Sequence, residues 1–159
     1  MKTNTGFTLI EVLIAMIILA MGLLGLAGLQ ATSLRNNQSA YNRGVATQLA
    51  YDIADRMRAN YSYVNTSNNN AYTSIAPNIA VQDPNCSSAI GCAPAAMAQN
   101  DLFEWNQAIQ SSLPGTPAKP PTGTITPNVN VFTITINWDD NRDGNVDNKD
   151  PGFQMSFQL

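Results

Sequence analysis

Histidine is absent from this chain of 159 residues, and charged residues of either sign make up only 12% of it. Without histidine, the commonest general base, the serine-type triad and most zinc sites are excluded. With a net charge of −3, the chain has no cluster of Lys and Arg of the kind that binds nucleic acid. We therefore expect one modest domain that is not an enzyme and has no nucleic-acid partner.

Cysteine is scarce, with only Cys86 and Cys92, which lie in the segment CSSAIGC. Gly91 can make a tight turn between them, and the two residues are predicted to form a small disulfide loop in an oxidising compartment. Two free thiols in a loop are the alternative, and the exported character of the N-terminal segment favours the disulfide. Two sulfurs without histidine do not suggest a metal site.

One long hydrophobic run stands near the N-terminus, where residues 12–34 contain no charge. About 20 apolar residues are enough to cross a bilayer as a helix, and residues 7–29 are dominated by Leu, Ile, Ala, Val and Met. The run is longer than the core of a conventional signal peptide, and it continues smoothly into a helical pattern. A simple membrane anchor explains the hydrophobicity but not Glu11, a carboxylate near its start.

The stretch GFTLIEVLIAM, residues 6–16, resembles the class III signal of type IV pilins and pseudopilins. The resemblance implies that a prepilin peptidase removes residues 1–6 as a leader by cutting between Gly6 and Phe7. Phe7 is then N-methylated, and Glu11 becomes the fifth residue of the mature chain.

The family glutamate pairs with the terminal amine of a neighbouring subunit during assembly, so Glu11 is implied to pair with Phe7 of its neighbour. A lone charge in a bilayer costs about 2.5–3.5 kcal/mol or more, which would drive this pairing. A glutamate that reaches the membrane interface is the alternative.

The apolar run is predicted to continue as an amphipathic helix. No proline precedes Pro77, so an unbroken helix is expected over residues 7–60, with 7–30 as the transmembrane or fibre-core half and 31–60 as the amphipathic half. The stripe predicted to pack on the head is Leu34, Tyr41, Val45, Leu49, Ile53 and Met57, with Ala46, Ala50 and Ala54 alongside. The charged residues Asp52, Asp55, Arg56 and Arg58 are interpreted as a solvated face with local ion pairs, with an inter-subunit contact as the alternative.

A narrower resemblance covers residues 21–60, which include LAYDIADRMRAN, and the later stretch DLFEWNQ. These are similar to minor pilins of the PilV type, the type IV pilus modification proteins. The resemblance implies an inner-membrane, single-pass protein with a periplasmic head that joins the pilus by way of a priming or tip complex. Its partners would be other minor pilins, the major pilin, the inner-membrane assembly platform and the prepilin peptidase. The alternatives are a minor pseudopilin of type II secretion and a membrane-tethered calcium-binding or adhesive module.

The head is expected over residues 61–159, and the predicted fold class is α+β, a type IV pilin fold with a long N-terminal helix packed on a small antiparallel sheet. Residues 61–100 are interpreted as loop-rich with short strands such as 75–81, and residues 114–127 as a Pro/Gly/Thr linker. A short helix over 101–113 would be capped by Asp101 with Glu104 and would bury Trp105. Alternating apolar residues at 129–138 and 152–159 predict an antiparallel hairpin.

Residues 139–150, DDNRDGNVDNKD, lie between these strands and have the spacing of a calcium loop. The candidate ligands are Asp139, Asn141, Asp143, Asn145, Asp147 and Asp150. The loop resembles the dockerin-type variant of the EF-hand, which also ends in Asp, although strands rather than helices flank it here. No cofactor is required for a structural role, so Ca2+ is the one candidate, and a polar hairpin turn is the alternative.

Overall fold

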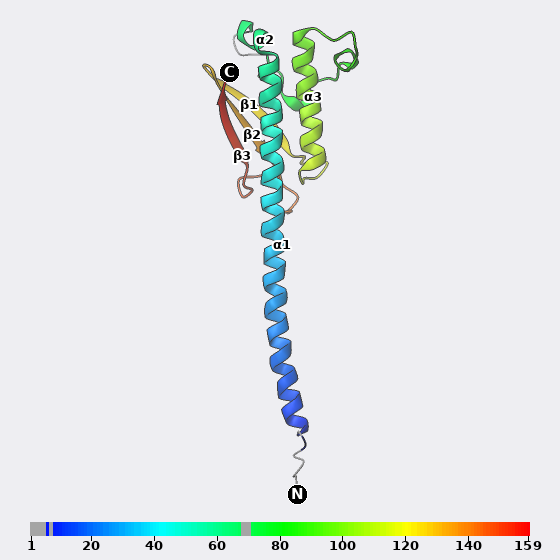
Figure 1. Ribbon diagram of the computed structural model, residues 1–159, viewed down its shortest axis with the longest axis vertical. Coiled ribbons are helices and arrows are strands. Elements are labelled where there is room, and N and C mark those ends of the chain that lie inside the picture. Colours follow the sequence, from blue (N-terminus) through cyan, green and yellow to red (C-terminus); the bar gives the residue numbers. More distant parts are fainter. Residues whose placement is uncertain (1–5, 7, 68–70) are drawn as a thin grey trace. The chain divides into compact units, whose positions relative to one another are not determined.

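The computed structural model describes residues 6, 8–67 and 71–159 (Figure 1). Along the chain the elements are α1 Leu9–Ala59, α2 Tyr61–Thr66, the 3-10 helices η1 Pro77–Ile79 and η2 Pro84–Ser87, α3 Pro94–Ser112, and the strands β1 Thr122–Asn128, β2 Val131–Asn137 and β3 Phe153–Gln158. They belong to two compact units, Met1–Ala40 and Tyr41–Leu159, and the boundary between the units falls within α1. The second unit is called the head below.

Helix α1 has 51 residues and lies within the segment 7–60, where the absence of proline predicts an unbroken helix. Its first helical hydrogen bonds run from the N–H groups of Glu11 and Val12 to the carbonyl of Thr8. Good helix formers, chiefly Leu, Ala and Met, fill much of the first half. The helix ends at Ala59, and after Asn60 the chain continues as the short helix α2.

The head is built around the C-terminal part of α1. The buried positions of this helix are Asn42, Ala46, Ala50, Ile53, Ala54 and Met57. Alanine at three of these positions allows close packing against the rest of the core, because it adds little side-chain volume. Leu34 and Tyr41 were predicted in the same stripe, but their side chains are 69% and 64% exposed. The buried face therefore begins at Asn42 and lies on the alanine side of the predicted stripe.

The core continues from α1 into α3 and the sheet. Trp105 and Ile109 of α3 share one cluster with Phe132, Ile134 and Ile136 of β2, and all five side chains are fully buried. Figure 1 shows the sheet and α3 flanking the part of α1 that belongs to the head. The prediction that Trp105 is a core residue is confirmed.

Three antiparallel strands form the sheet, in the order β1-β2-β3. Strands β2 and β3 pair from Val131 opposite Gln158 to Ile136 opposite Phe153, so the predicted hairpin is confirmed. Alternate residues of β2 are buried, as the sequence pattern predicts. The α+β class and the long N-terminal helix packed on a small antiparallel sheet are likewise confirmed.

The predicted linker over residues 114–127 is wrong at its C-terminal end, because Thr122–Asn128 forms β1 and pairs with β2 along its whole length. Glycine has a steric role in this strand. A Cβ atom at Gly123 would overlap the indole ring of Trp105 and the side chain of Ile109. The strand therefore lies closely against α3 only because residue 123 has no side chain.

Two further predictions for the head are corrected. Helix α3 begins at Pro94 rather than at residue 101, with the proline in its first turn, a position at which a missing N–H costs nothing. Asp101 is consequently a buried residue within the helix and not its cap. No strand occurs in the described parts of 61–100, which contain α2, η1 and η2, and η1 occupies the middle of the predicted strand 75–81.

Candidate functional site

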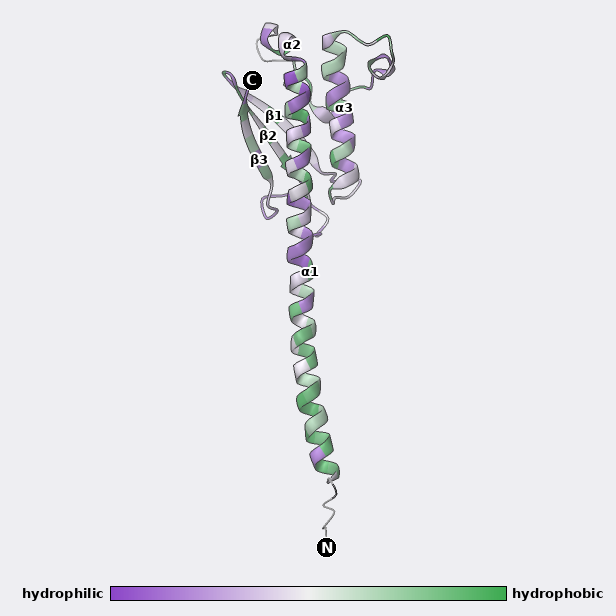
Figure 2. Ribbon diagram, in the orientation of Figure 1, coloured by the Kyte–Doolittle hydropathy of each residue, from purple (hydrophilic) through white to green (hydrophobic). Residues whose placement is uncertain are grey.

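The first half of α1 presents apolar side chains to its surroundings without covering them. Its large apolar residues from Leu9 to Leu29 are all exposed, from 46% for Val12 to 82% for Leu9. Figure 2 shows that this part of the helix is mostly hydrophobic. By length and composition α1 could cross a membrane, although an N-terminal signal sequence also meets these two criteria. An exposed apolar surface of this extent marks a segment that contacts lipid or other proteins.

Glu11 lies in the first turn of α1, the position at which a carboxylate interacts favourably with the helix dipole. Within the described residues its carboxylate forms no ion pair, and apolar residues surround it in sequence on both sides. Gly6, the predicted last residue of the leader, is exposed. Residues 1–5 of the predicted leader and Phe7, the predicted site of cleavage and N-methylation, lie outside the described residues.

Arg56 connects α1 to α3 within the head. Its Nη1 donates to Asp101 Oδ1 at 3.1 Å and to Glu104 Oε2 at 2.7 Å, and its Nε donates to Asp52 at 3.0 Å. Partial burial lowers the pKa of Arg56, but the hydrogen bonds to Glu104 and Asp101 more than offset this, so the pKa lies above its ordinary value. The predicted local ion pair of Arg56 with Asp52 is present, but Arg56 also binds two carboxylates of α3, so the interpretation as a solvated face is incomplete for this residue.

Asp101 is the buried centre of this network. Its second oxygen, Oδ2, accepts a 2.6 Å hydrogen bond from the hydroxyl of Tyr72, whose side chain is itself fully buried. Burial, and after it the hydrogen bond to Asp101, raises the pKa of Tyr72 above its ordinary value. Asn60 donates to the same hydroxyl at 3.3 Å and to the carbonyl of Pro94 at 2.9 Å. The end of α1, the start of α3 and the segment around Tyr72 are thus fixed by one set of hydrogen bonds.

The other two charged residues near the end of α1, Asp55 and Arg58, form a local ion pair. Arg58 pairs with Asp55 at 2.7 Å, as predicted, and its guanidinium also lies 5.1 Å from the ring centroid of Phe157 in β3. Both charged side chains are substantially exposed, so the ion pair itself contributes little to stability.

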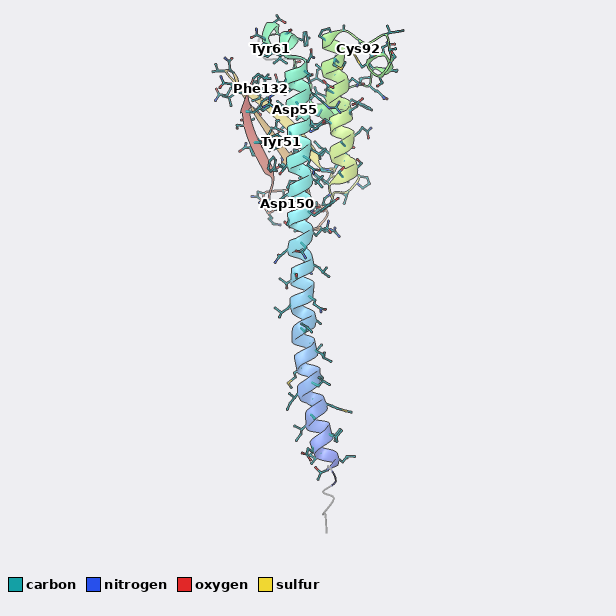
Figure 3. The ribbon with its side chains drawn as sticks, in the orientation of Figure 1. Tyr51, Asp55, Tyr61, Cys92, Phe132 and Asp150 are labelled. Carbon is teal, nitrogen blue, oxygen red and sulfur yellow. A yellow bond between two sulfur atoms is a disulfide. The ribbon has the colours of Figure 1, made fainter. Side chains whose placement is uncertain are left out.

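Cys86 and Cys92 form a disulfide that closes a short loop between η2 and α3, with their Cα atoms 4.7 Å apart. Gly91 has φ +75°, a conformation that favours glycine, as expected for the tight turn in this loop. Figure 3 shows Cys92 beside the N-terminal end of α3. The segment before the loop is also attached to α3, because the backbone N–H of Asp83 donates to Asn100 Oδ1 at 3.1 Å. The predicted disulfide is present.

The acidic segment 139–150 is organised by carboxylates that accept backbone N–H groups. Asp139 accepts from Asp143 at 3.1 Å and from Gly144 at 2.9 Å. Asp150 accepts from Asp140 at 3.0 Å and from Asp147 at 3.1 Å, which closes the loop across its base. The segment is therefore a folded turn built from its own aspartates.

This geometry bears on the predicted calcium site. Over residues 6, 8–67 and 71–159, no group of three or more His, Cys, Asp or Glu side chains is gathered so that it could hold a metal ion. Both Asp139 and Asp150 use both of their carboxylate oxygens on backbone amides. Calcium binding by this loop therefore stays a prediction.

The same segment is attached to α1 by residues that the sequence did not single out. Asp140 accepts hydrogen bonds from Trp138 Nε1 at 2.8 Å and from Asn42 Nδ2 at 3.1 Å. Asn42 is almost completely buried in α1. Sequence reasoning thus missed the buried contacts of Asn42 and Tyr72, and it gave Asp101 a different role, as a helix cap. Only the polar identity of Asn42 beside an apolar stripe could have drawn attention to one of them.

Two family models match adjoining segments of the chain. Residues 1–27 match the prokaryotic N-terminal methylation motif, and residues 28–103 match the Tt1218-like family, described as Type IV pilin Tt1218. Neither a curated protein nor a solved structure matches the chain.

A long N-terminal helix packed on a small antiparallel sheet, together with a match to the methylation motif, makes this chain similar to the type IV pilin class. Within that class, the similarity over residues 28–103 is to the Tt1218-like pilins. The motif and the exposed apolar helix fit a membrane-anchored pilin with a structural role, which a prepilin peptidase processes before it assembles into a pilus.

Proposed function

We propose that this protein is a minor pilin that takes part in starting type IV pilus assembly, within a priming or tip complex. The observation that carries the proposal is Glu11 in the first turn of an exposed apolar helix, inside the match to the methylation motif. The similarity of residues 21–60 and of DLFEWNQ to PilV-type minor pilins supports the narrower role. The proposed partners are other minor pilins, the major pilin and the inner-membrane assembly platform, and the protein is a single-pass inner-membrane protein before assembly.

The proposed assembly step follows from the cost of a charge in a membrane. After cleavage between Gly6 and Phe7, the new α-amine of Phe7 is a cation at the same end of the chain as Glu11. A carboxylate in hydrocarbon costs about 2.5–3.5 kcal/mol or more, and pairing with the amine of a neighbouring subunit removes much of this cost. The exposed apolar helix meanwhile exchanges lipid for the helices of neighbouring subunits. Both contributions favour movement of the subunit from the bilayer into the fibre.

N-terminal sequencing and mass analysis of the protein from membranes and from sheared pili test processing and location together. The expected result is a chain that begins with methylated Phe7 and occurs in sheared pili at low abundance relative to the major pilin. A protein that retains residues 1–6 and still supports pilus formation would overturn the proposal.

The role of Glu11 is tested by Glu11→Gln, which keeps the shape of the side chain and removes its charge. This variant should insert into the membrane at a normal level, whereas its amount in sheared pili should fall about tenfold or more, because the amine of the neighbour loses its partner. Asp55→Asn, which removes an exposed charge of α1 in the head, is the matched control and should enter pili normally. Normal incorporation of Glu11→Gln would contradict the proposed pairing.

Deletion of the gene separates the pilus role from a role in type II secretion. Loss of twitching motility with normal secretion of exoproteins is expected for a minor pilin. The reverse result would assign the protein to secretion as a minor pseudopilin.

A further inference from the structure

Strand β3 is the outer strand of the sheet on the side opposite β1 (Figure 1). It pairs with β2 along one edge, and in the described part of the chain no segment pairs with its other edge. In an antiparallel sheet, alternate residues direct both their N–H and C=O groups to the same edge. Every second residue of β3 therefore presents a backbone donor and a backbone acceptor at the outer edge, where another strand can bind.

Natural proteins usually protect such an edge with charged residues, proline or a bulge. The strand Phe153–Gln158, FQMSFQ, contains no charged residue and no proline, and its register with β2 is continuous, without a bulge. Its outward face is neutral and polar, since Ser156 lies 2.9 Å from Thr133 and Gln154 donates to Thr135 at 3.4 Å across the two strands. The strand therefore lacks these three protective features.

The inward face of β3 is incompletely covered. Phe132, Ile134 and Ile136 of the neighbouring strand β2 are fully buried, whereas Phe153, Met155 and Phe157 are only half-buried against the same core. A fourth strand with apolar residues at alternate positions would extend this row and cover its exposed side. Main-chain hydrogen bonds would then supply affinity, and the alternating apolar side chains would supply specificity.

Charge distinguishes the two ends of this edge. The segment 139–150, which leads into β3, carries five aspartates against two basic residues, Arg142 and Lys149. Lys149 lies 3.7 Å from Asp147, so the remaining aspartates leave this end of the edge negative. At the other end of the strand, Arg58 lies against Phe157. A strand antiparallel to β3 would place its C-terminal end beside the aspartates.

We propose that the outer edge of β3 is a binding site for an extended segment of a partner protein that adds as a fourth, antiparallel strand. The partner segment has apolar residues at alternate positions, neutral residues between them and a basic residue at its C-terminal end, next to segment 139–150. Assembly through Glu11 does not use this edge, so the two proposals can fail independently.

The test uses the full-length protein in detergent and a fluorescently labelled peptide, Val-Thr-Val-Thr-Val-Thr-Lys, with a blocked C-terminus. Fluorescence anisotropy should show saturable binding with a Kd of about 0.1–1 mM. Moving the lysine to the N-terminal end should weaken binding about two- to five-fold at low salt, and high salt should reduce this difference. At about ten times the Kd, amide hydrogen exchange within residues 153–158 should slow about tenfold.

A matched pair of variants tests the charge at the loop end. Asp147 and Asp83 each accept the backbone N–H of the residue two positions later, at 2.8 and 2.9 Å, and asparagine can keep that hydrogen bond. Asp147→Asn should weaken binding of the C-terminal-lysine peptide about two- to five-fold. Asp83→Asn, which removes the same charge beside α3, should leave binding unchanged.

Absence of binding at a peptide concentration of about 5 mM, or protection that falls on β1 rather than on residues 153–158, would overturn the proposal. Equal binding of the two lysine peptides would overturn the antiparallel orientation on which it depends. Protection of β3 in the protein without peptide, together with a dimer in sedimentation, would show that a second copy of the chain occupies the edge and would replace the proposed partner.

Discussion

Tyr72→Phe removes one hydroxyl from the hydrogen-bond network that joins α1 to α3, and the structure sets the size of the effect. The hydroxyl donates to Asp101 at 2.6 Å, and the side chain of Tyr72 is 1% exposed. A hydrogen bond to a charged group contributes about 1.5–3 kcal/mol, and its loss leaves a buried carboxylate oxygen without a donor. Arg56 still binds the other oxygen of Asp101, so a loss of about 2 kcal/mol in the free energy of unfolding is expected.

Urea unfolding followed by tryptophan fluorescence measures this free energy. Both tryptophans, Trp105 and Trp138, are fully buried in the head, so their emission reports the head rather than the first half of α1. Tyr51→Phe is the matched control, because the side chain of Tyr51 is 55% exposed and lies on α1 (Figure 3). The control should change the free energy of unfolding by less than about 0.5 kcal/mol.

A double-mutant cycle with Asp101→Asn tests the pairing itself. If the two side chains act together, the effect of Tyr72→Phe should shrink by about 1 kcal/mol or more once Asp101 has lost its charge. Additive effects, or a Tyr72→Phe variant as stable as Tyr51→Phe, would refute the reasoning that this network stabilises the head.

Three further predictions concern the rest of the head. Gly123→Ala should lower the free energy of unfolding by about 1–3 kcal/mol, because the added methyl group overlaps Trp105, and an unchanged urea midpoint would contradict the close packing of β1 on α3. The hydrogen bond from Arg56 holds the pKa of Glu104 below its ordinary value of 4.5, so its contribution to stability is present above about pH 4.5 and is lost as the pH falls through the lower folded-state pKa. Glu104→Gln should therefore flatten this acid part of the stability curve, and an identical pH dependence in both proteins would count against the pair. The calcium prediction for residues 139–150 expects saturable heat in calorimetric titration of the full chain and a higher melting temperature, and titration without heat rejects it.

Local sequence patterns were sufficient where a single element determines its own structure. The apolar run without proline predicted α1, and strict alternation predicted β2 and β3 with their antiparallel pairing. The close spacing of Cys86 and Cys92 around Gly91 likewise predicted the disulfide.

Prediction failed where structure depends on residues that are distant in sequence. Strand β1 has the composition of a loop, but it pairs with β2 along its whole length, and Gly123 leaves room for the ring of Trp105. Arg56 has the local spacing of an exposed pair with Asp52, but its other partners, Asp101 and Glu104, lie 45 and 48 residues away. Nothing in local periodicity distinguishes such a residue from an exposed one.

Asp101 is a second residue whose role depends on contacts that are distant in sequence. As a polar residue three positions before Glu104, it resembles a helix cap. The true beginning of α3 lies in a segment rich in alanine, where Pro94 in the first turn is a start signal but no side chain caps the helix. The buried hydrogen bond to Tyr72 appears only once the segment containing residue 72 has been placed against α3.

The boundary of the head within α1 has a consequence for producing it as a water-soluble fragment. Asn42 is the first buried residue of α1 and donates to Asp140, so a fragment that starts at Asn42 would begin at a residue the fold needs. A start near residue 34 would leave about two turns of helix ahead of Asn42 and would omit the exposed apolar half of α1, which requires detergent. Such a fragment should be secretable and amenable to crystallisation. Removal of a few more residues is expected to destabilise the part of the head around Asn42.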